Sequence, residues 1–349
     1  MATKRTSDTR RAFEEDGSLK THVGGQALIE GVMMRGRYNW TVAVREPSGE
    51  LYTEEHDLAS GKAKNRWLYL PVIRGCRAFV ESLVLGYKAL SIAGAHAFSE
   101  EADPDAPEGE DEGFEFGSGA MAVSMVMGLL LGAALFIVVP AVATNLMVGE
   151  YDAQTVLWNI VDGIIRVAVF IFYIWLVGRM SDVKRMFGFH GAEHKTIHCY
   201  EHGLPLTPEN ARSFPRLHVR CGTAFLIMVM IIAIIVYTVT PINGLIDAWG
   251  VHDTVPKLVL VMAVRLLLMP VIAGVSYEIT VKWAGCHPES RLVRIVLWPG
   301  LQMQRLTTRE PDDEQLACAI AAMKPVLERE RAEAAAARNR SGQAAESAA

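Results

Sequence analysis

The chain has few cysteines, and they do not occur in closely spaced pairs. Five cysteines are spread over 349 residues, and no Cys-x-x-Cys pair is present. An odd number without such pairs argues against a disulfide framework and favours a reducing compartment. A structural zinc built from Cys199, Cys221, Cys286 and His287 is an alternative, but this spacing is unlike that of known zinc motifs.

The sequence also lacks an excess of charge of one sign. It has 34 Lys and Arg against 39 Asp and Glu, a formal net charge of −5. Without a basic field, nucleic acid is not the favoured partner. Residues 1–22 contain no apolar core and no small-residue cleavage site. We therefore expect a disordered arm there rather than a signal peptide.

Long apolar runs, in contrast, are plentiful. Four segments reach the roughly 20 residues needed to cross a bilayer: 119–148, 156–178, 222–241 and 257–283. Pro140 predicts a kink in the first of them. The expected fold is mainly α, a four-helix transmembrane bundle whose main partner is the lipid bilayer.

The distribution of Lys and Arg predicts the orientation of these spans. Residues 149–155 contain neither residue, whereas the histidine-rich loop 179–221 contains seven, and more follow residue 283. We expect a multi-pass protein of the cytoplasmic (inner) membrane, with both termini and the 179–221 loop in the cytoplasm.

The remaining segments are less apolar. Residues 23–66 contain two strand-like stretches, "WTVAVR" and "ELYTEE", around the turn "EPSG", and predict a small β-rich cytoplasmic unit. Residues 67–98 are too charged to cross and predict an amphipathic, interfacial helix. An acidic linker at 99–118, a cytoplasmic C-terminal region at 284–328 with a helix beginning in "TREPDDEQ", and a disordered tail at 329–349 complete the chain.

The segment "FHGAEHKTIHCYEHG" places His190, His194, His198 and His202 four residues apart. On a helix, neighbours in this series lie one turn apart and can share an ion, but all four cannot. Its H-x-x-E-H core has the inverzincin order, in which two imidazoles hold a metal and the intervening carboxylate, here Glu193, acts as a base. The alternative is a solvated helix whose imidazoles titrate near neutral pH.

A third metal ligand has to come from elsewhere. His218 precedes the third apolar run and returns to the same membrane face, and Glu278 lies near the cytoplasmic end of the fourth. A carboxylate in an apolar span usually faces a partner or a cavity. For Glu278, a salt bridge to an Arg or Lys is the alternative to metal binding.

Three further charges fall inside the apolar runs. Asp162 and Arg166 are four residues apart in the second run, and Arg265 lies in the fourth. We expect a structural ion pair joined by Arg265; a polar pathway through the membrane is the alternative.

The chain resembles the YqhQ-like family of bacterial membrane proteins over roughly residues 24–323. The matching blocks are "GGQALIEGVMMRG", "FHGAEHKTIHCYEHG", "RLHVRCGTAFL", "AGVSYEI" and "LQMQRLTTREPDD". This family is catalogued as a domain of unknown function and described as predicted metal-dependent enzymes. The resemblance implies that Glu30, Arg35, Arg220 and Cys221 belong to the functional surface, and it supplies no substrate.

These observations favour a metal-dependent hydrolase with a zinc ion at the cytoplasmic face and a peptide or lipid-linked substrate. One alternative is a metal or proton transporter or sensor that uses the same histidines. Another is a non-enzymatic membrane scaffold that binds a protein partner. A homo-oligomer is compatible with all three.

Overall fold

The computed structural model describes most of the chain. The described residues are 11–13, 23–58, 66–98, 118–149, 155–240, 242, 246, 248–251, 254–284, 287 and 290–346. The acidic linker expected at 99–118 lies outside these ranges except for Ser118. Of the expected N-terminal arm, residues 11–13 are described: they form a helical segment in which Ala12 is fully buried against Leu217 and Leu301.

The expected β-rich unit is an antiparallel sheet of four strands in sequential order. Its strands are β1 (Gly24–Leu28), β2 (Gly31–Arg35), β3 (Asn39–Arg45) and β4 (Leu51–Asp57). The β1–β2 hairpin pairs Leu28 with Gly31, and Glu30 in its turn has a positive φ of 51°. Positive φ at a residue other than glycine is uncommon, and here it occurs in the tight turn between two paired strands.

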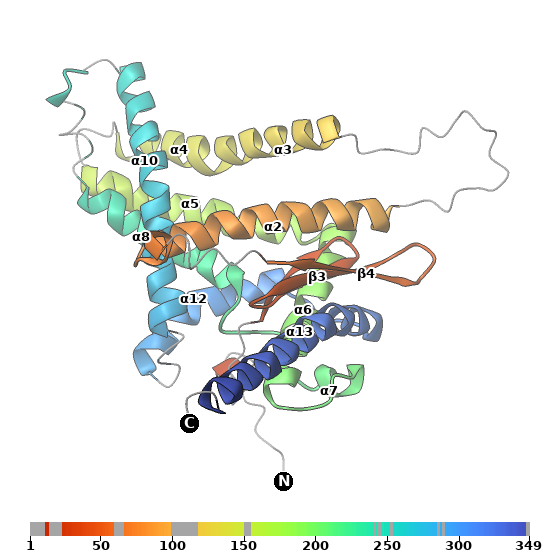
Figure 1. Cartoon of the computed structure of the whole chain (residues 1–349). Coiled ribbons are helices and arrows are strands. Elements are labelled where there is room, and N and C mark those ends of the chain that lie inside the picture. Colours follow the sequence, from red (N-terminus) through yellow and green to blue (C-terminus); the bar gives the residue numbers. More distant parts are fainter. Residues whose placement is uncertain are drawn as a thin grey trace, which may run out of the picture.

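Both faces of this sheet are covered, so that it forms the middle of three layers (Figure 1). On one face, Met33, Trp40 and Val42 pack against α2 (Ile73–Ala97), which follows the short helix η1 (Arg66–Tyr69). On the other face, Val32 and Met34 pack against α6 (Ser181–Glu201) and α13 (Asp313–Glu346). Alternation of side chains along β2 thus buries apolar residues on both sides.

The four expected apolar spans are helical. The first is α3 (Ser118–Ala133), η2 (Ala134–Val138) and α4 (Val139–Val148); the others are α5 (Thr155–Val177), α8 (Gly222–Val239), and α10 (Thr254–Tyr277) continued by η3 (Glu278–Trp283). The stretch before Pro140 is a π-helical turn rather than a simple kink. Proline lacks an amide hydrogen and crowds the preceding turn, and a wider turn relieves this conflict.

By length and composition, five helices rather than four are apolar enough to cross a membrane, because α2 qualifies as well. The charges in residues 67–98 had predicted an interfacial helix that does not cross. Arg77 and Glu81 of α2, however, form an ion pair, and Glu81 also pairs with Arg35 of β2. The charges therefore gather on one side of the helix, and Val80, Leu83 and Val84 are exposed.

The C-terminal region contains α12 (Arg291–Thr307) and α13, while the short α7 (Pro208–Arg212) follows α6. The predicted start of α13 is a capping box: Asp312 Oδ1 accepts from the Gln315 amide at 2.8 Å, and Gln315 Oε1 accepts from the Asp312 amide at 3.2 Å. We expected a disordered tail from residue 329 onward. The structure differs from this expectation, because α13 continues to Glu346. Its Ala, Glu and Arg residues are strong helix formers.

The expected intramembrane ion pair is present and connects three spans. Arg166 Nη2 lies 2.7 Å and Arg265 Nη1 3.4 Å from Asp162 Oδ2. Arg265 also donates to Asn159 Oδ1 at 2.7 Å, and the Tyr237 hydroxyl donates to the Arg265 carbonyl at 3.0 Å. These bonds join α5, α8 and α10, which supports a structural role for the cluster.

Replacing Arg265 should therefore destabilise the protein. In Arg265→Leu, Asp162 keeps one of its two guanidinium partners and Asn159 loses a donor, so we expect a loss of roughly 1–3 kcal/mol. Thermal unfolding of the detergent-solubilised protein measures this. Leu267→Ala is the control, since Leu267 is 77% exposed on the same helix. Equal stability of the two variants would contradict the structural role.

Candidate metal centre

The candidate site lies on α6, a polar helix that is buried from Phe187 to Cys199. His190 and His194, one turn apart, are 8% and 1% exposed, and their ring centroids lie 4.5 Å apart. The helical spacing predicted for the histidine series is thus observed. The burial is not that of a solvated helix, so the imidazoles depend on protein partners for their hydrogen bonds.

Each of these two imidazoles is fixed by a backbone carbonyl at Nδ1. His190 Nδ1 lies 2.8 Å from the carbonyl oxygen of Thr307, at the end of α12, and His194 Nδ1 lies 2.6 Å from that of Arg216. A carbonyl only accepts, so both Nδ1 atoms carry hydrogen, and Nε2 is in each ring the atom that can bind a metal once it carries no proton. Metal-binding histidines are commonly oriented in this way.

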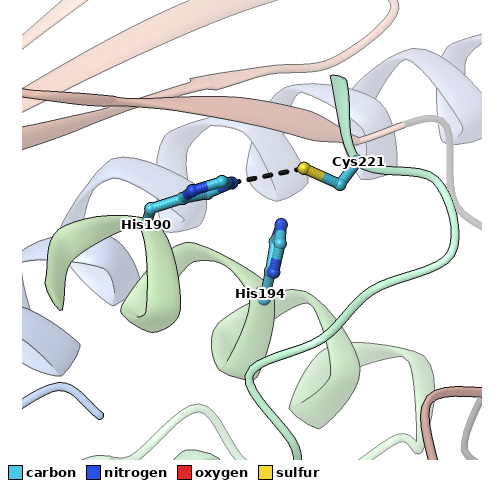
Figure 2. A group of neighbouring side chains, drawn as sticks. All are labelled: His190, His194 and Cys221. Carbon is cyan, nitrogen blue, oxygen red and sulfur yellow. Dashed lines mark hydrogen bonds between the residues drawn. The ribbon is translucent and has the colours of Figure 1, made fainter. Parts of the chain in front are cut away.

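Cys221 supplies a third ligand atom. Its sulfur lies 3.2 Å from His190 Nε2, and Figure 2 shows the thiol and the ring nitrogens of both histidines facing a common point. Ligand atoms of His190, His194 and Cys221 all lie within 4.8 Å of one another. Cys221 is the N-cap of α8, so the group joins α6 to the beginning of an apolar span.

The donor set fits a zinc ion. His194 Nε2 is buried, and within the described part of the chain the Cys221 sulfur is the ligand atom that it faces; no hydrogen bond of ordinary geometry satisfies it, and an imidazole nitrogen is costly to bury unpaired. Zinc prefers nitrogen and thiolate ligands at about 2.0 and 2.3 Å. Only three such groups meet within the described ranges, which leaves a fourth tetrahedral position for water or substrate.

Electrostatics within this group favours a thiolate. Burial raises the pKa of the Cys221 thiol, but the neighbouring His194 and His190 lower it by more, so that it lies well below its usual value. Burial lowers the pKa of His190, yet the Cys221 sulfur and Glu193 reverse this effect and raise it to about 9. The thiolate form is the one that binds metals.

Glu193 lies in α6 between the two histidines and is covered by the sheet. The amide of Gly25 in β1 hydrogen-bonds its carboxyl group, and burial raises the pKa of that carboxyl. A Cβ atom at residue 25 would stand 2.8 Å from Glu193 Cδ, so the strand can approach this closely only because the residue is glycine.

The other two histidines predicted as ligands belong to a separate group. Ligand atoms of His198, Glu201 and His218 also lie within 4.8 Å of one another. The guanidinium of Arg220, however, binds the Glu201 carboxylate and lies 3.3 Å from His218 Nε2. Burial lowers the pKa of His198 to about 3 and that of His218 well below its usual value, so both are neutral. A side-chain cation therefore already occupies this group.

The structure does not bring Glu278 to the histidines. Its carboxylate forms an ion pair with Arg74, whose Nε lies 2.7 Å from Glu278 Oε1, and accepts from the Val72 amide at 3.2 Å. This pair holds the start of α2 against the π-helical turn η3. The salt bridge weighed as the alternative for Glu278 is the observed arrangement.

Two further predicted residues hold the sheet to its neighbours. Glu30 forms an ion pair with Arg185 of α6, and Arg35 pairs with Glu81 of α2 at 2.9 Å. Both residues therefore support the layers around the site and are not part of the group formed by His190, His194 and Cys221.

The atoms that orient the histidines could not be predicted from the sequence. Cys221 was placed on the functional surface but not in the ligand set with His190 and His194. The carbonyls of Thr307 and Arg216 leave no signal in sequence, because any residue has one. For the alternative cysteine site, Cys199 is buried beside Pro205, with Sγ 3.5 Å from its carbonyl, and Cys286 lies outside the described residues.

Comparison with known proteins gives a family and no activity. Residues 70–329 match the family model described as "Protein of unknown function (DUF1385)". The chain is 30% identical over 312 residues to "Uncharacterized protein YqhQ" of Bacillus subtilis (strain 168), covering 87% of this chain and 92% of that protein. No solved structure matches. The chain therefore belongs to the DUF1385 family, as its resemblance to YqhQ-like proteins implied.

Proposed function

We propose that the protein is a multi-pass protein of the cytoplasmic membrane with its sheet, α6 and α13 in the cytoplasm. The connection between α5 and α8 contains seven Lys and Arg residues, and that between α4 and α5 contains none. Such an asymmetry places the basic connection inside.

Contacts within the cytoplasmic part also limit the number of crossings. Gly25 of β1 contacts Glu193 of α6, so both lie on one side of the membrane. Between them the chain passes through α2, then α3 to α4, then α5. If the last two crossings are complete, α2 begins and ends on the same side. Its exposed apolar face then lies in the interfacial region, and the protein has four complete spans.

Accessibility of introduced cysteines tests this topology. Trp67 and Phe98 flank α2 and are 60% and 61% exposed, while Gly149 lies between α4 and α5. In a background in which Cys76, Cys221 and Cys286 are replaced by serine, a membrane-impermeant maleimide should label Trp67→Cys and Phe98→Cys from the cytoplasmic side. Gly149→Cys should be labelled from the opposite side. Labelling of residues 67 and 98 from different sides would show that α2 crosses.

We further propose that the protein is a metal-dependent hydrolase. The observation that carries this proposal is the convergence of His190, His194 and Cys221, in which the His194 Nε2 atom is buried without a hydrogen bond of ordinary geometry. Three protein ligands and an open fourth position are typical of catalytic zinc, whereas structural zinc sites have four protein ligands.

The neighbouring groups suit hydrolysis. A bound zinc ion supplies a Lewis acid and lowers the pKa of a water ligand to about 7. The Glu193 carboxylate, raised in pKa by burial, is placed to accept a proton, and the Gly25 amide holds its orientation. Because Cys221 begins an apolar helix, the site is at the end of a span. A peptide or lipid-linked substrate at the membrane surface fits this position.

Metal content after purification tests the ligand set. We expect about one zinc per chain in the unsubstituted protein and loss of most of it in His194→Ala and Cys221→Ser. Elemental analysis measures this directly. Glu278→Gln is the matched control, since it removes a carboxylate that pairs with Arg74, and Glu193→Gln should retain zinc while abolishing hydrolysis.

Absence of bound metal from the unsubstituted protein, after expression with added zinc, would end the hydrolase proposal. Equal metal content in His194→Ala and in the Glu278→Gln control would show that any bound zinc lies elsewhere.

A second candidate function is favoured by the 3.2 Å contact between Cys221 and His190: nucleophilic catalysis by the thiolate. Metal-free protein distinguishes the two. Its Cys221 should react with iodoacetamide at a pH below the ordinary thiol pKa, and His190→Ala should slow that reaction. If Cys221 is a ligand, added zinc blocks alkylation; if it is a nucleophile, zinc leaves the rate unchanged. Mass spectrometry of the modified peptide measures the rate.

The transporter alternative receives less support from the structure. Asp162, Arg166 and Arg265 bond to one another and to the polar groups of Asn159 and Tyr237, as expected of a structural cluster.

A further inference from the structure

The outer face of α12 exposes large apolar side chains. Leu292, Ile295 and Trp298 are 57%, 69% and 55% exposed, and they lie three residues apart along the helix. Residues at this spacing lie near one another on a helix surface, so the three form one stripe. Apolar side chains exposed together mark an interaction surface, and tryptophan is typical of the membrane–water interface.

The same face of α12 is strongly basic. Arg291, Arg294 and Arg305 are exposed, and the sequence contains no acidic residue from Ser290 to Arg309. A helix that combines an apolar stripe with arginines, without acids, matches a bilayer surface that carries anionic headgroups. An apolar partner protein would explain the stripe but not this charge.

The opposite face of α12 is attached to a membrane span. A Cβ atom at Gly300 would stand 2.5 Å from Ala224 Cβ, so the backbones of α12 and α8 are in direct contact. Leu226 and Ile235 of α8 are exposed and apolar. The face of α12 opposite the stripe therefore packs along α8, a helix that itself exposes apolar side chains.

The C-terminal half of α12 reaches the candidate metal centre. The Gln304 side chain accepts from the His218 amide and donates to the His218 carbonyl, both at 2.8 Å. The Thr307 carbonyl holds His190 Nδ1 at 2.8 Å. A displacement of α12 would therefore disturb the hydrogen bond that orients one of the metal ligands.

We propose that α12 docks on anionic phospholipid headgroups and that this contact holds His190 in its metal-binding orientation. In the observed position Arg291, Arg294 and the apolar stripe lie on one exposed face of α12, so lipid that binds this face would favour that position. A ligand that binds one position better shifts the population toward it. The docking is independent of the proposed hydrolase activity, whereas its effect on metal binding rests on the metal centre.

The docking is tested on the full chain by native mass spectrometry, in competition between phosphatidylglycerol and phosphatidylcholine. The unsubstituted protein should retain phosphatidylglycerol preferentially, and Arg291→Gln/Arg294→Gln should lower this preference by roughly tenfold. Arg331→Gln/Arg340→Gln, which removes two exposed arginines from α13, is the matched control and should leave it unchanged. Equal retention in the two double variants would overturn the docking, as would a change in oligomeric state without a change in lipid retention.

The effect on the metal centre is tested with the same proteins in nanodiscs. Zinc affinity of the unsubstituted chain should be roughly fivefold higher with phosphatidylglycerol than with phosphatidylcholine alone, and the Arg291→Gln/Arg294→Gln protein should lose this difference. Equal zinc affinity in the two lipids overturns the coupling and leaves the docking. A chain that binds no zinc, yet retains phosphatidylglycerol through α12, overturns the coupling and the hydrolase proposal together, and again leaves the docking.

Discussion

The arrangement of the cytoplasmic part depends on the burial of a polar helix. From Phe187 to Cys199, α6 is buried although it contains three histidines, a glutamate and a lysine. Polar side chains are costly to bury without hydrogen-bond partners, and a single helix cannot supply them. The partners come from elsewhere: the Gly25 amide, and the carbonyls of Arg212, Arg216, Leu217 and Thr307. The hairpin, the connection before α8 and the end of α12 are thereby fixed around α6.

This constraint explains why one pair of histidines suits a metal and the next does not. His190 and His194 donate to carbonyls through Nδ1, so that both Nε2 atoms face the Cys221 thiol rather than the backbone. His198 instead uses Nε2 toward the Leu217 carbonyl, and its other neighbours include a glutamate already bound by Arg220. Equal spacing in the sequence therefore produces two chemically different groups.

Much of the architecture could be predicted from periodicity and composition. The apolar runs, the strands around "EPSG" and the start of α13 are local features, and each is observed at or close to its predicted place. The pairing of His190 with His194 is also local, because helical spacing alone brings them together. The partner of Glu278 could not be predicted in this way. A metal bound by the histidines and a basic side chain were both suitable partners by charge, and the packing of α2 on η3 selects Arg74.

Cys221 is a second example of a contact that the sequence alone could not predict. It lies 27 residues after His194, and the intervening chain has to turn at α7 and return along α6 before the thiol reaches the imidazoles. The difference beyond residue 329, where disorder was predicted and α13 is observed, has another cause. Low complexity was taken to mean disorder, whereas the same alanines and glutamates favour continuation of a helix that is already anchored on the sheet.

The position of Glu193 bears on whether the metal centre is structural or catalytic. A fourth protein ligand would close the coordination sphere, and Glu193 is the nearest carboxylate in sequence to both histidines. Its carboxyl group is instead hydrogen-bonded by the Gly25 amide, an interaction that depends on the absence of a side chain at residue 25. If His190, His194 and Cys221 bind a metal as proposed, a carboxylate held by the backbone beside them would keep its proton-accepting ability and would leave a coordination position to water or substrate. The close approach of β1 to α6 therefore favours chemistry at this centre over a purely structural role.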